Sequence, residues 1–221
     1  MGGMIPLGDA SRRPSGFSIV TTLIILLNVL VFFRELSHGD EFVWAWSVIP
    51  VRITHGRHWI TLLTSMFMHA GWMHIIGNMI YLWAFGREIE NVMGSVRFLI
   101  FYLAGGIVAM MAQIAADPLS RVPTLGASGA IAAVMGAFLI IFPGDRIRTV
   151  IFFFIFIRVT YIPAVFLIGF WFLTQVFNVG VVAQVKTGGV AYLAHIGGFL
   201  FGVVLARLFE SPRRLAYTRR Y

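Results

Sequence analysis

Four polar residues of kinds that support acyl transfer lie in apolar surroundings in this chain of 221 residues. Ser128 offers a hydroxyl nucleophile, and His195 offers an imidazole that can take the proton from that hydroxyl. His74 and Asn78 offer side-chain N–H groups, which stabilise the oxyanion that forms when a serine attacks a carbonyl. Because such side chains are costly in hydrocarbon, we expect them to face the interior of a helix bundle or a water-filled cavity.

The composition is that of a membrane protein. Hydrophobic residues make up 59% of the chain and charged residues 12%, against roughly 25% charged residues in soluble domains. The mean hydropathy of +0.87 predicts an all-α membrane protein that forms one helical domain. The absence of cysteine excludes disulfides, a thiolate metal site and a thiol nucleophile.

Apolar runs predict a bundle of six transmembrane helices. The predicted spans are Phe17–Phe33, Trp72–Phe85, Val96–Ala116, Ala127–Phe142, Tyr161–Phe177 and Val190–Phe209. Another apolar run, Val150–Ile157, is too short to cross the bilayer, and we expect it to lie at the interface or to extend the fifth helix. The segment from Glu35 to about Thr64 is predicted to be a long outer loop, which associates with the membrane through its tryptophans.

The distribution of basic residues predicts that both termini are cytoplasmic. Six spans place the termini on one side, and a cytoplasmic assignment puts 12 of the 17 Lys and Arg residues inside. The 12 inside are Arg12, Arg13, Arg87, Arg97, Arg146, Arg148, Arg158, Arg207, Arg213, Arg214, Arg219 and Arg220. The five outside are Arg34, Arg52, Arg57, Arg121 and Lys186. The net charge of +8 is therefore a topology signal and does not indicate a nucleic-acid partner.

The predicted organisation has three parts. Residues 1–16 are expected to form a cytoplasmic N-terminal tail, residues 17–209 the six-helix membrane domain, and residues 210–221 a basic cytoplasmic C-terminal tail. In this topology the second, fourth and sixth spans all enter from outside. The four polar residues therefore lie together in the outer part of the bundle, where a hydrolytic site requires a cavity filled with water.

Small residues are predicted to bring the fourth and sixth helices close together. Small-xxx-small faces let helix backbones approach closely. The faces are formed by Ser128, Ala132 and Gly136 on the fourth helix and by His195, Gly198 and Gly202 on the sixth. A close crossing would place the Ser128 hydroxyl within hydrogen-bond reach of His195. The alternative is that the serine bonds back to its own helix and the histidine only joins helices.

A metal site is the second alternative for the histidines. His69, His74 and His195 could supply three ligands for zinc. However, His69 and His74 are five residues apart, and neither segment contains a carboxylate that could act as the base. Glu88 and Glu90 lie at the inner end of the second span. We therefore predict no metal and no cofactor.

The motifs "HAGWMHIIGN", "GASGA" and "AHIGGFLFG" occur in this order on the second, fourth and sixth spans. Together with "FGREIENVMG" they resemble the rhomboid intramembrane serine proteases, of the prokaryotic type with six spans. The resemblance implies that Ser128 is the nucleophile and His195 the general base and then acid, in a dyad without aspartate. It also implies that His74, Asn78 and the Ser128 N–H form the oxyanion hole.

The resemblance implies supporting roles for further residues. His69 would organise the loop and water near the site, Gly126 and Gly129 flank the nucleophile, and the glycines of the sixth span support the dyad. The structural residues are Gly86, Glu90 and Gly94, with Glu90 capping or tying the cytoplasmic ends of spans two and three. Two departures from the family pattern are Ile60 after Trp59, in place of arginine, and Ala132, where some members have a tyrosine that packs on the histidine.

The function implied is hydrolysis of peptide bonds in or near transmembrane segments. The partners would be single-span membrane proteins and lipids, with no nucleic acid, and the location a prokaryotic plasma membrane. Phe170, Trp171 and Phe172 are candidates for a lateral gate or are simply lipid-facing. Two rivals are a non-catalytic rhomboid-like protein that holds membrane clients and a small transporter, although the chain has no internal repeat of the kind many transporters have.

Overall fold

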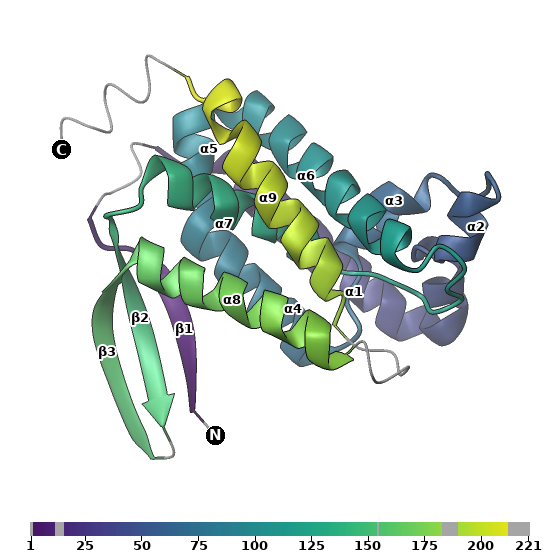
Figure 1. Ribbon diagram of the computed structural model, residues 1–221, viewed down its shortest axis with the longest axis horizontal. Coiled ribbons are helices and arrows are strands. Elements are labelled where there is room, and N and C mark those ends of the chain that lie inside the picture. Colours follow the sequence, from purple (N-terminus) through teal and green to yellow (C-terminus); the bar gives the residue numbers. More distant parts are fainter. Residues whose placement is uncertain (1, 12–15, 154, 183–189, 212–221) are drawn as a thin grey trace.

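The computed structural model describes residues 2–11, 16–153, 155–182 and 190–211. Each predicted span overlaps a helical segment, and these segments surround α7 (Figure 1). The longer segments are α1 (Ile19–Trp46), α4 (Trp72–Tyr81), η2 (Leu82–Gly86), α5 (Arg87–Met93), α6 (Ser95–Ala116), α7 (Ser128–Ile141), α8 (Ala164–Val182) and α9 (Tyr192–Phe209). The basic C-terminal tail expected from residue 210 onward lies almost wholly outside the described residues.

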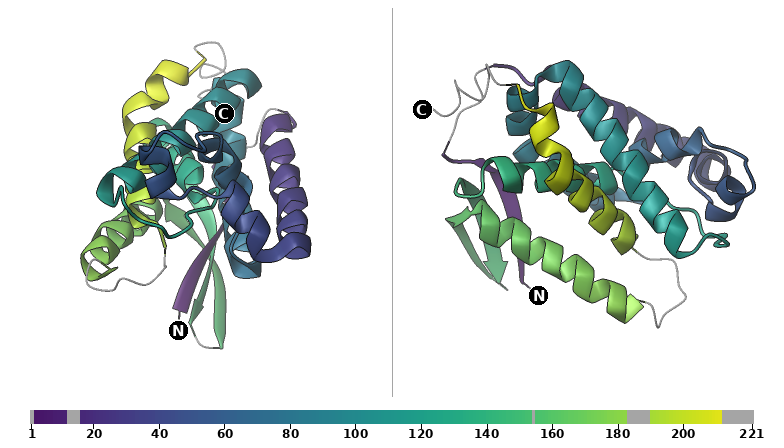
Figure 2. Two further views of the ribbon diagram at one scale, coloured as in Figure 1. Left: turned by 90° about the vertical axis from the view of Figure 1, so that its right-hand side faces the viewer. Right: turned by 45° about the horizontal axis from the view of Figure 1, so that its top comes forward.

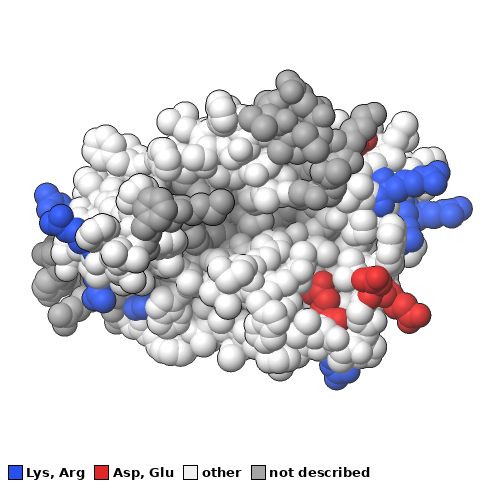
Figure 3. Space-filling view, turned by 90° about the horizontal axis from the view of Figure 1, so that it is seen from below, with Lys and Arg blue, Asp and Glu red and all other residues white. Residues whose placement is uncertain are grey.

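Length and hydropathy mark several of these helices as membrane-spanning. Among the described residues, α1, α6 and α9 are long and apolar enough to cross a bilayer, and α7 and most of α8 are shorter apolar helices. On the face shown in Figure 3, charged side chains gather near the two ends, and a broad uncharged band separates them. Such a band is what a bilayer requires of the surface that faces its hydrocarbon.

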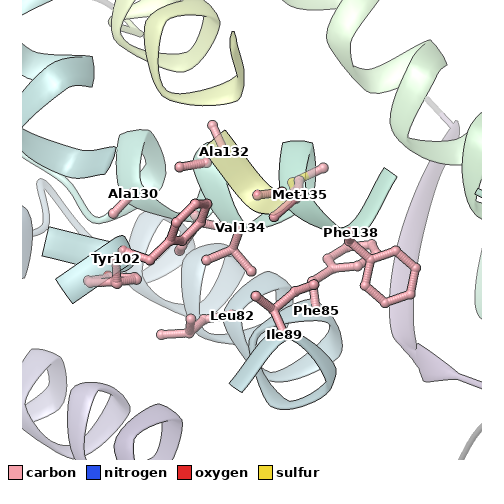
Figure 4. Close-up of a cluster of buried hydrophobic side chains, with 14 of the residues drawn as sticks. Leu82, Phe85, Ile89, Tyr102, Ala130, Ala132, Val134, Met135 and Phe138 are labelled. Carbon is pink, nitrogen blue, oxygen red and sulfur yellow. The ribbon is translucent and has the colours of Figure 1, made fainter. Parts of the chain in front are cut away.

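The core is built around α7, which is buried along almost its whole length. Side chains of α7 pack against the helical stretch from α4 to α5. For example, the ring centroids of Phe85 and Phe138 are 5.2 Å apart (Figure 4). The opposite face of α7 lies against α9. A methyl group at Gly198 would overlap the Gly129 carbonyl oxygen, and one at Gly202 would overlap the Ala133 carbonyl oxygen. The backbones of α7 and α9 therefore touch directly, which only glycine permits.

A three-stranded antiparallel sheet corrects the all-α prediction. Its strands are β1 (Gly2–Asp9), β2 (Arg146–Phe153) and β3 (Phe156–Pro163), in the order β1-β2-β3. The sheet lies beside α8 and away from α6 (Figures 1 and 2). β1 packs against α4 and η2, and β2 and β3 pack against α8. The sheet thus bridges the second and fifth spans.

Three expectations change with this sheet. The run Val150–Ile157 neither extends the fifth helix nor forms one of its own, because its described residues belong to the β2–β3 hairpin. The fifth helix consequently begins at Ala164 and not at Tyr161. The segment expected as an N-terminal tail contains β1, which pairs with β2 from Gly2 to Asp9. Backbone hydrogen bonds between strands, and not local helical preference, decide the structure of these segments.

The first connection is more ordered than the predicted loop. α1 continues through Glu35 to Trp46 and is kinked at Gly39, which has φ +61°. The short elements α2 (Pro50–Thr54), α3 (Thr61–Thr64) and η1 (Ser65–Phe67) follow. Trp59 and Ile60 are both exposed, so Ile60, which stands where the family pattern has arginine, does not fix this loop by burying its side chain.

Glu90 joins the ends of the first and third spans. Its carboxylate accepts hydrogen bonds from the backbone N–H groups of Val20 and Thr21, from the Thr21 hydroxyl and from the Ser95 hydroxyl, at 2.8–2.9 Å. It caps the first turn of α1, whose N–H groups have no acceptor within the helix. Glu90 is itself on α5, so one carboxylate ties α1, α5 and the start of α6 together.

Glu90→Gln should destabilise the fold and leave catalysis per folded molecule unchanged. The amide would replace an acceptor oxygen with an N–H₂ group that faces other donors, at a cost of about 1–3 kcal/mol. The check is thermal unfolding in detergent, with the exposed Glu41→Gln as the matched control. A melting temperature equal to that of the wild type would show that the capping contacts contribute nothing.

Candidate active site

Ser128 and His195 are in direct contact. Ser128 is the first residue of α7, and His195 lies one turn into α9. The Nε2 atom of His195 is 2.7 Å from the Ser128 Oγ atom, which is a hydrogen-bond distance for a nucleophile and its base. The contact is possible because the glycines of α7 and α9 let the two backbones touch just below it. The arrangement can deprotonate the serine as it attacks a carbonyl.

His74 and Asn78 present N–H donors on the same side of the bundle. The Nδ1 atom of His74 accepts the Ala70 backbone N–H at 3.3 Å, so the Nε2 atom of the neutral ring carries the proton. A methyl group at Gly126 would lie 3.0 Å from this Nε2 atom and 3.6 Å from the Ser128 Oγ atom. Both atoms therefore face the same small space, which Gly126 keeps open with a φ of +133° that favours glycine.

The Asn78 amide is a second free donor. Its side chain is buried, and among the described residues its Nδ2 atom has no hydrogen-bond partner. A buried donor without a partner is costly, and such exceptions in a native structure call for an explanation. Asn78 lies one turn after His74 on α4, so the two side chains share one face of that helix. An acceptor oxygen that enters beside this face of α4 would satisfy the donor.

Gln175 on α8 is a contact of His195 that the sequence interpretation missed. Its Oε1 atom is 2.8 Å from the Nδ1 atom of His195, and the Trp171 ring lies beside the imidazole with its centroid 5.8 Å away. These side chains contact the His195 ring, whereas the alanine at position 132 offers no aromatic ring that could pack on it. The signal was available, because Gln175 is a polar residue in a span, which by itself marks a functional candidate.

A family comparison covers the part of the chain that holds these residues. The model of the rhomboid domain matches residues 56–211, which include both members of the Ser128–His195 pair and the two donors on α4. The chain belongs to the rhomboid family. It is 30% identical to the rhomboid protease GluP of Bacillus subtilis over 96% of this chain and 39% of that protein.

Other rhomboid relatives are bacterial and mitochondrial. The putative rhomboid protease YdcA of Bacillus subtilis is 30% identical over 56% of this chain and 62% of its own length. Rhomboid protein 1 of Saccharomyces cerevisiae mitochondria is 30% identical over 70% of this chain and 44% of its own length. The chain therefore spans about two fifths to three fifths of these relatives, and it is a multi-pass membrane protein like other rhomboids.

His69 packs against His74, one of the candidate site residues. Its ring is buried edge-on against the His74 ring, with centroids 5.0 Å apart, and its backbone N–H donates to the buried Glu35 carboxylate at 2.9 Å. Burial, together with the neighbouring His74, lowers the pKa of His69 to about 3, so the His69 ring is neutral. Glu35, placed by sequence only at the start of a loop, thus anchors the turn that precedes α4.

Two of the candidate gate residues on α8 differ in their packing. Phe170 is exposed, whereas Phe172 stacks on Phe199 of α9 with a centroid distance of 4.3 Å. A pocket beside Ser128 is lined mainly by small residues of α6, α7 and α9 and by the segment before α7.

The metal alternative also has a structural test. No group of three or more His, Asp or Glu side chains within the described residues is arranged to hold a metal ion.

The structural glycines act at close approaches and turns. A methyl group at Gly86 would lie 2.9 Å from Leu82 Cδ1 and 3.3 Å from Thr21 Cγ2, so Gly86 lets α1 approach η2. Gly94 has φ +84° and forms the turn between α5 and α6. A methyl group at Gly129 would lie 2.6 Å from the Ala109 side chain of α6. These positions hold the helices that carry the site.

Proposed function

We propose that the protein is an intramembrane serine protease that hydrolyses peptide bonds in or near transmembrane segments of membrane proteins. The observation that carries the proposal is the 2.7 Å contact between the Ser128 hydroxyl and His195 Nε2 in a chain of the rhomboid family. Family membership alone does not distinguish an enzyme from a member that only holds clients. The presence of both reacting groups at hydrogen-bond distance favours the enzyme.

The mechanism follows from the roles of the site residues. Ser128 attacks the scissile carbonyl while His195 takes the hydroxyl proton, and His195 then returns this proton to the leaving amine. Water hydrolyses the acyl-enzyme with His195 again as the base. The His74 and Asn78 N–H groups and the Ser128 backbone N–H stabilise the oxyanion in both steps. As the first residue of α7, Ser128 has a backbone N–H without an acceptor inside the helix.

A substrate helix needs a lateral opening to reach Ser128. α8 packs against α7 and α9, whereas α4 and α8 are not packed along one another in the described residues. The sheet bridges them instead, through β1 on α4 and η2 and through β2 and β3 on α8. We infer that single-span membrane proteins approach between α4 and α8, from the bilayer of a prokaryotic plasma membrane in which both termini are cytoplasmic.

The test is cleavage of a panel of single-span model substrates by the purified protein in liposomes. We expect discrete cleavage products, complete loss of cleavage after treatment with a serine-directed phosphonate or isocoumarin, and covalent labelling of Ser128. Strong chelators should leave cleavage unchanged, since the proposed chemistry uses only side chains and water. Ser128→Ala is the control for contaminating proteases.

Two results would contradict this proposal. Loss of cleavage on chelation, with restoration by zinc, would indicate the three-histidine metal alternative. Stable binding of the substrates without cleavage or phosphonate labelling would indicate a rhomboid that holds its clients.

A further inference from the structure

We propose that Gln175 is a positioning residue that fixes the tautomer and the orientation of the His195 imidazole, so that the catalytic pair works with a neutral third member. This inference rests on the proposed function. The Gln175 Oε1 atom lies 2.8 Å from His195 Nδ1, on the side of the ring opposite to Ser128. Gln175 reaches the ring from α8, a different helix from those that carry the dyad.

The side-chain amide of Gln175 can adopt only one orientation. Its Nε2 atom donates to the Trp171 carbonyl oxygen at 3.0 Å and to the Thr174 hydroxyl oxygen at 3.0 Å. The Thr174 hydroxyl donates its own proton to the same Trp171 carbonyl at 2.6 Å, so its lone pairs remain for the amide. A flipped amide would place an acceptor oxygen among acceptors. Oxygen, and not nitrogen, therefore faces His195.

An acceptor at Nδ1 decides which ring nitrogen is the base. The proton of the neutral imidazole lies on Nδ1, where it donates to the Gln175 oxygen. The lone pair is then on Nε2, which faces the Ser128 hydroxyl at 2.7 Å. The opposite tautomer would direct an N–H at the hydroxyl and could not accept its proton. Trp171 completes the support, since its ring packs beside the imidazole.

Burial explains why an amide suits this position. Gln175 and His195 are 7% and 8% exposed, so an ionised carboxylate here would lose most of its hydration, a cost that a neighbouring imidazolium would offset only in part. An amide oxygen orients the ring and stabilises the imidazolium through its dipole without adding a buried charge. Two titratable side chains lie near His195: His74 on α4, and Tyr192, whose ring is edge-on to the imidazole with the centroids 6.3 Å apart.

The experiment compares two substitutions that remove different halves of the amide. Gln175→Met keeps the length and packing but removes the acceptor, whereas Gln175→Glu keeps an acceptor oxygen and removes the N–H donors. We expect kcat to fall about tenfold in Gln175→Met with KM nearly unchanged, and to return to within about threefold of wild type in Gln175→Glu. The rate of phosphonate labelling of Ser128 should follow kcat.

A matched control separates this role from helix stability. Asn178 is also an amide on α8, and its Nδ2 atom donates only back to the Thr174 carbonyl, at 2.7 Å. Asn178→Leu should leave kcat unchanged. If Gln175 only braced α8 through its N–H donors, Gln175→Glu would be as impaired as Gln175→Met, and that result would overturn the proposal. A kcat of Gln175→Met within twofold of wild type would overturn it as well.

A second measurement does not depend on activity. Nitrogen-15 NMR of labelled histidine distinguishes protonated from unprotonated ring nitrogens, and we expect the Nδ1–H form of His195 in the wild type and a mixture of tautomers in Gln175→Met. An unchanged His195 signal in Gln175→Met would contradict the proposal. A wild type that cleaves no substrate would contradict the proposed function alone, because the tautomer is measured independently.

Discussion

Ser128→Ala and His195→Ala should each abolish proteolysis, with a loss in turnover on the order of 10⁶ for a dyad that acts as a unit. The physical reason is that neither group acts alone: the Ser128 hydroxyl is a weak nucleophile unless His195 takes its proton, and His195 has no such proton to take without Ser128. The double variant should therefore lose no more than either single variant. The measurement is the initial rate of cleavage of a single-span substrate in liposomes.

Folding must be checked in the same samples. Both side chains are partly or fully buried at the α7–α9 contact, yet alanine fits either position without overlap, so the melting temperature should change little. If the two single losses multiplied in the double variant, each residue would act independently, and the dyad would be the wrong description. Residual cleavage by Ser128→Ala would indicate another nucleophile.

His74→Ala and Asn78→Ala should each lower turnover by about 10²–10³-fold, or roughly 3–4 kcal/mol of transition-state stabilisation. His74 Nε2 faces the space beside Ser128 that Gly126 keeps open, and the buried Asn78 Nδ2 atom has no hydrogen-bond partner among the described residues. Because these donors bind the oxyanion better than the ground-state carbonyl, kcat should fall while KM changes little. The loss is smaller than for the dyad because two donors remain.

A purely structural role predicts a different pattern for these two residues. If His74 and Asn78 only joined helices, alanine would lower the melting temperature in detergent and leave turnover per folded molecule unchanged. Removing the unsatisfied amide of Asn78 should instead leave stability equal or raise it, since a buried donor without a partner is lost. Unchanged turnover with a lowered melting point would contradict the oxyanion role.

The helices were predictable because apolar length and charge placement are strong local signals. The sheet was not, for two reasons. The run Val150–Ile157 is apolar throughout, so it has no periodicity to separate strand from helix, although its β-branched and aromatic residues favour strands. Its partner strand, "GGMIPLGD", is rich in glycine and contains proline, and only pairing with residues far along the chain makes it a strand.

At the site too, residues could be predicted from local sequence, whereas contacts between helices could not. Ser128, His195, His74 and Asn78 could be selected because they are polar residues in apolar runs, and their motifs are short and ordered along the chain. Gln175 met the same criterion, but its partner is 20 residues away on another helix, and no local pattern indicates that contact. Glu35 was assigned to a loop that follows the apolar run ending at Phe33, whereas the helix continues to Trp46 with a bend at Gly39.

The pairing of β1 with β2 also constrains how many times the chain between them crosses the bilayer. Two strands that are hydrogen-bonded along their length must lie in the same aqueous compartment, so the chain between them crosses the membrane an even number of times. Four helical segments lie between them: α1, the stretch from α4 to α5, α6 and α7. During synthesis, β1 emerges first and has no partner until Arg146–Phe153 has been made. Formation of the sheet is therefore a late, high-contact-order event that can occur only in chains with the correct parity of crossings.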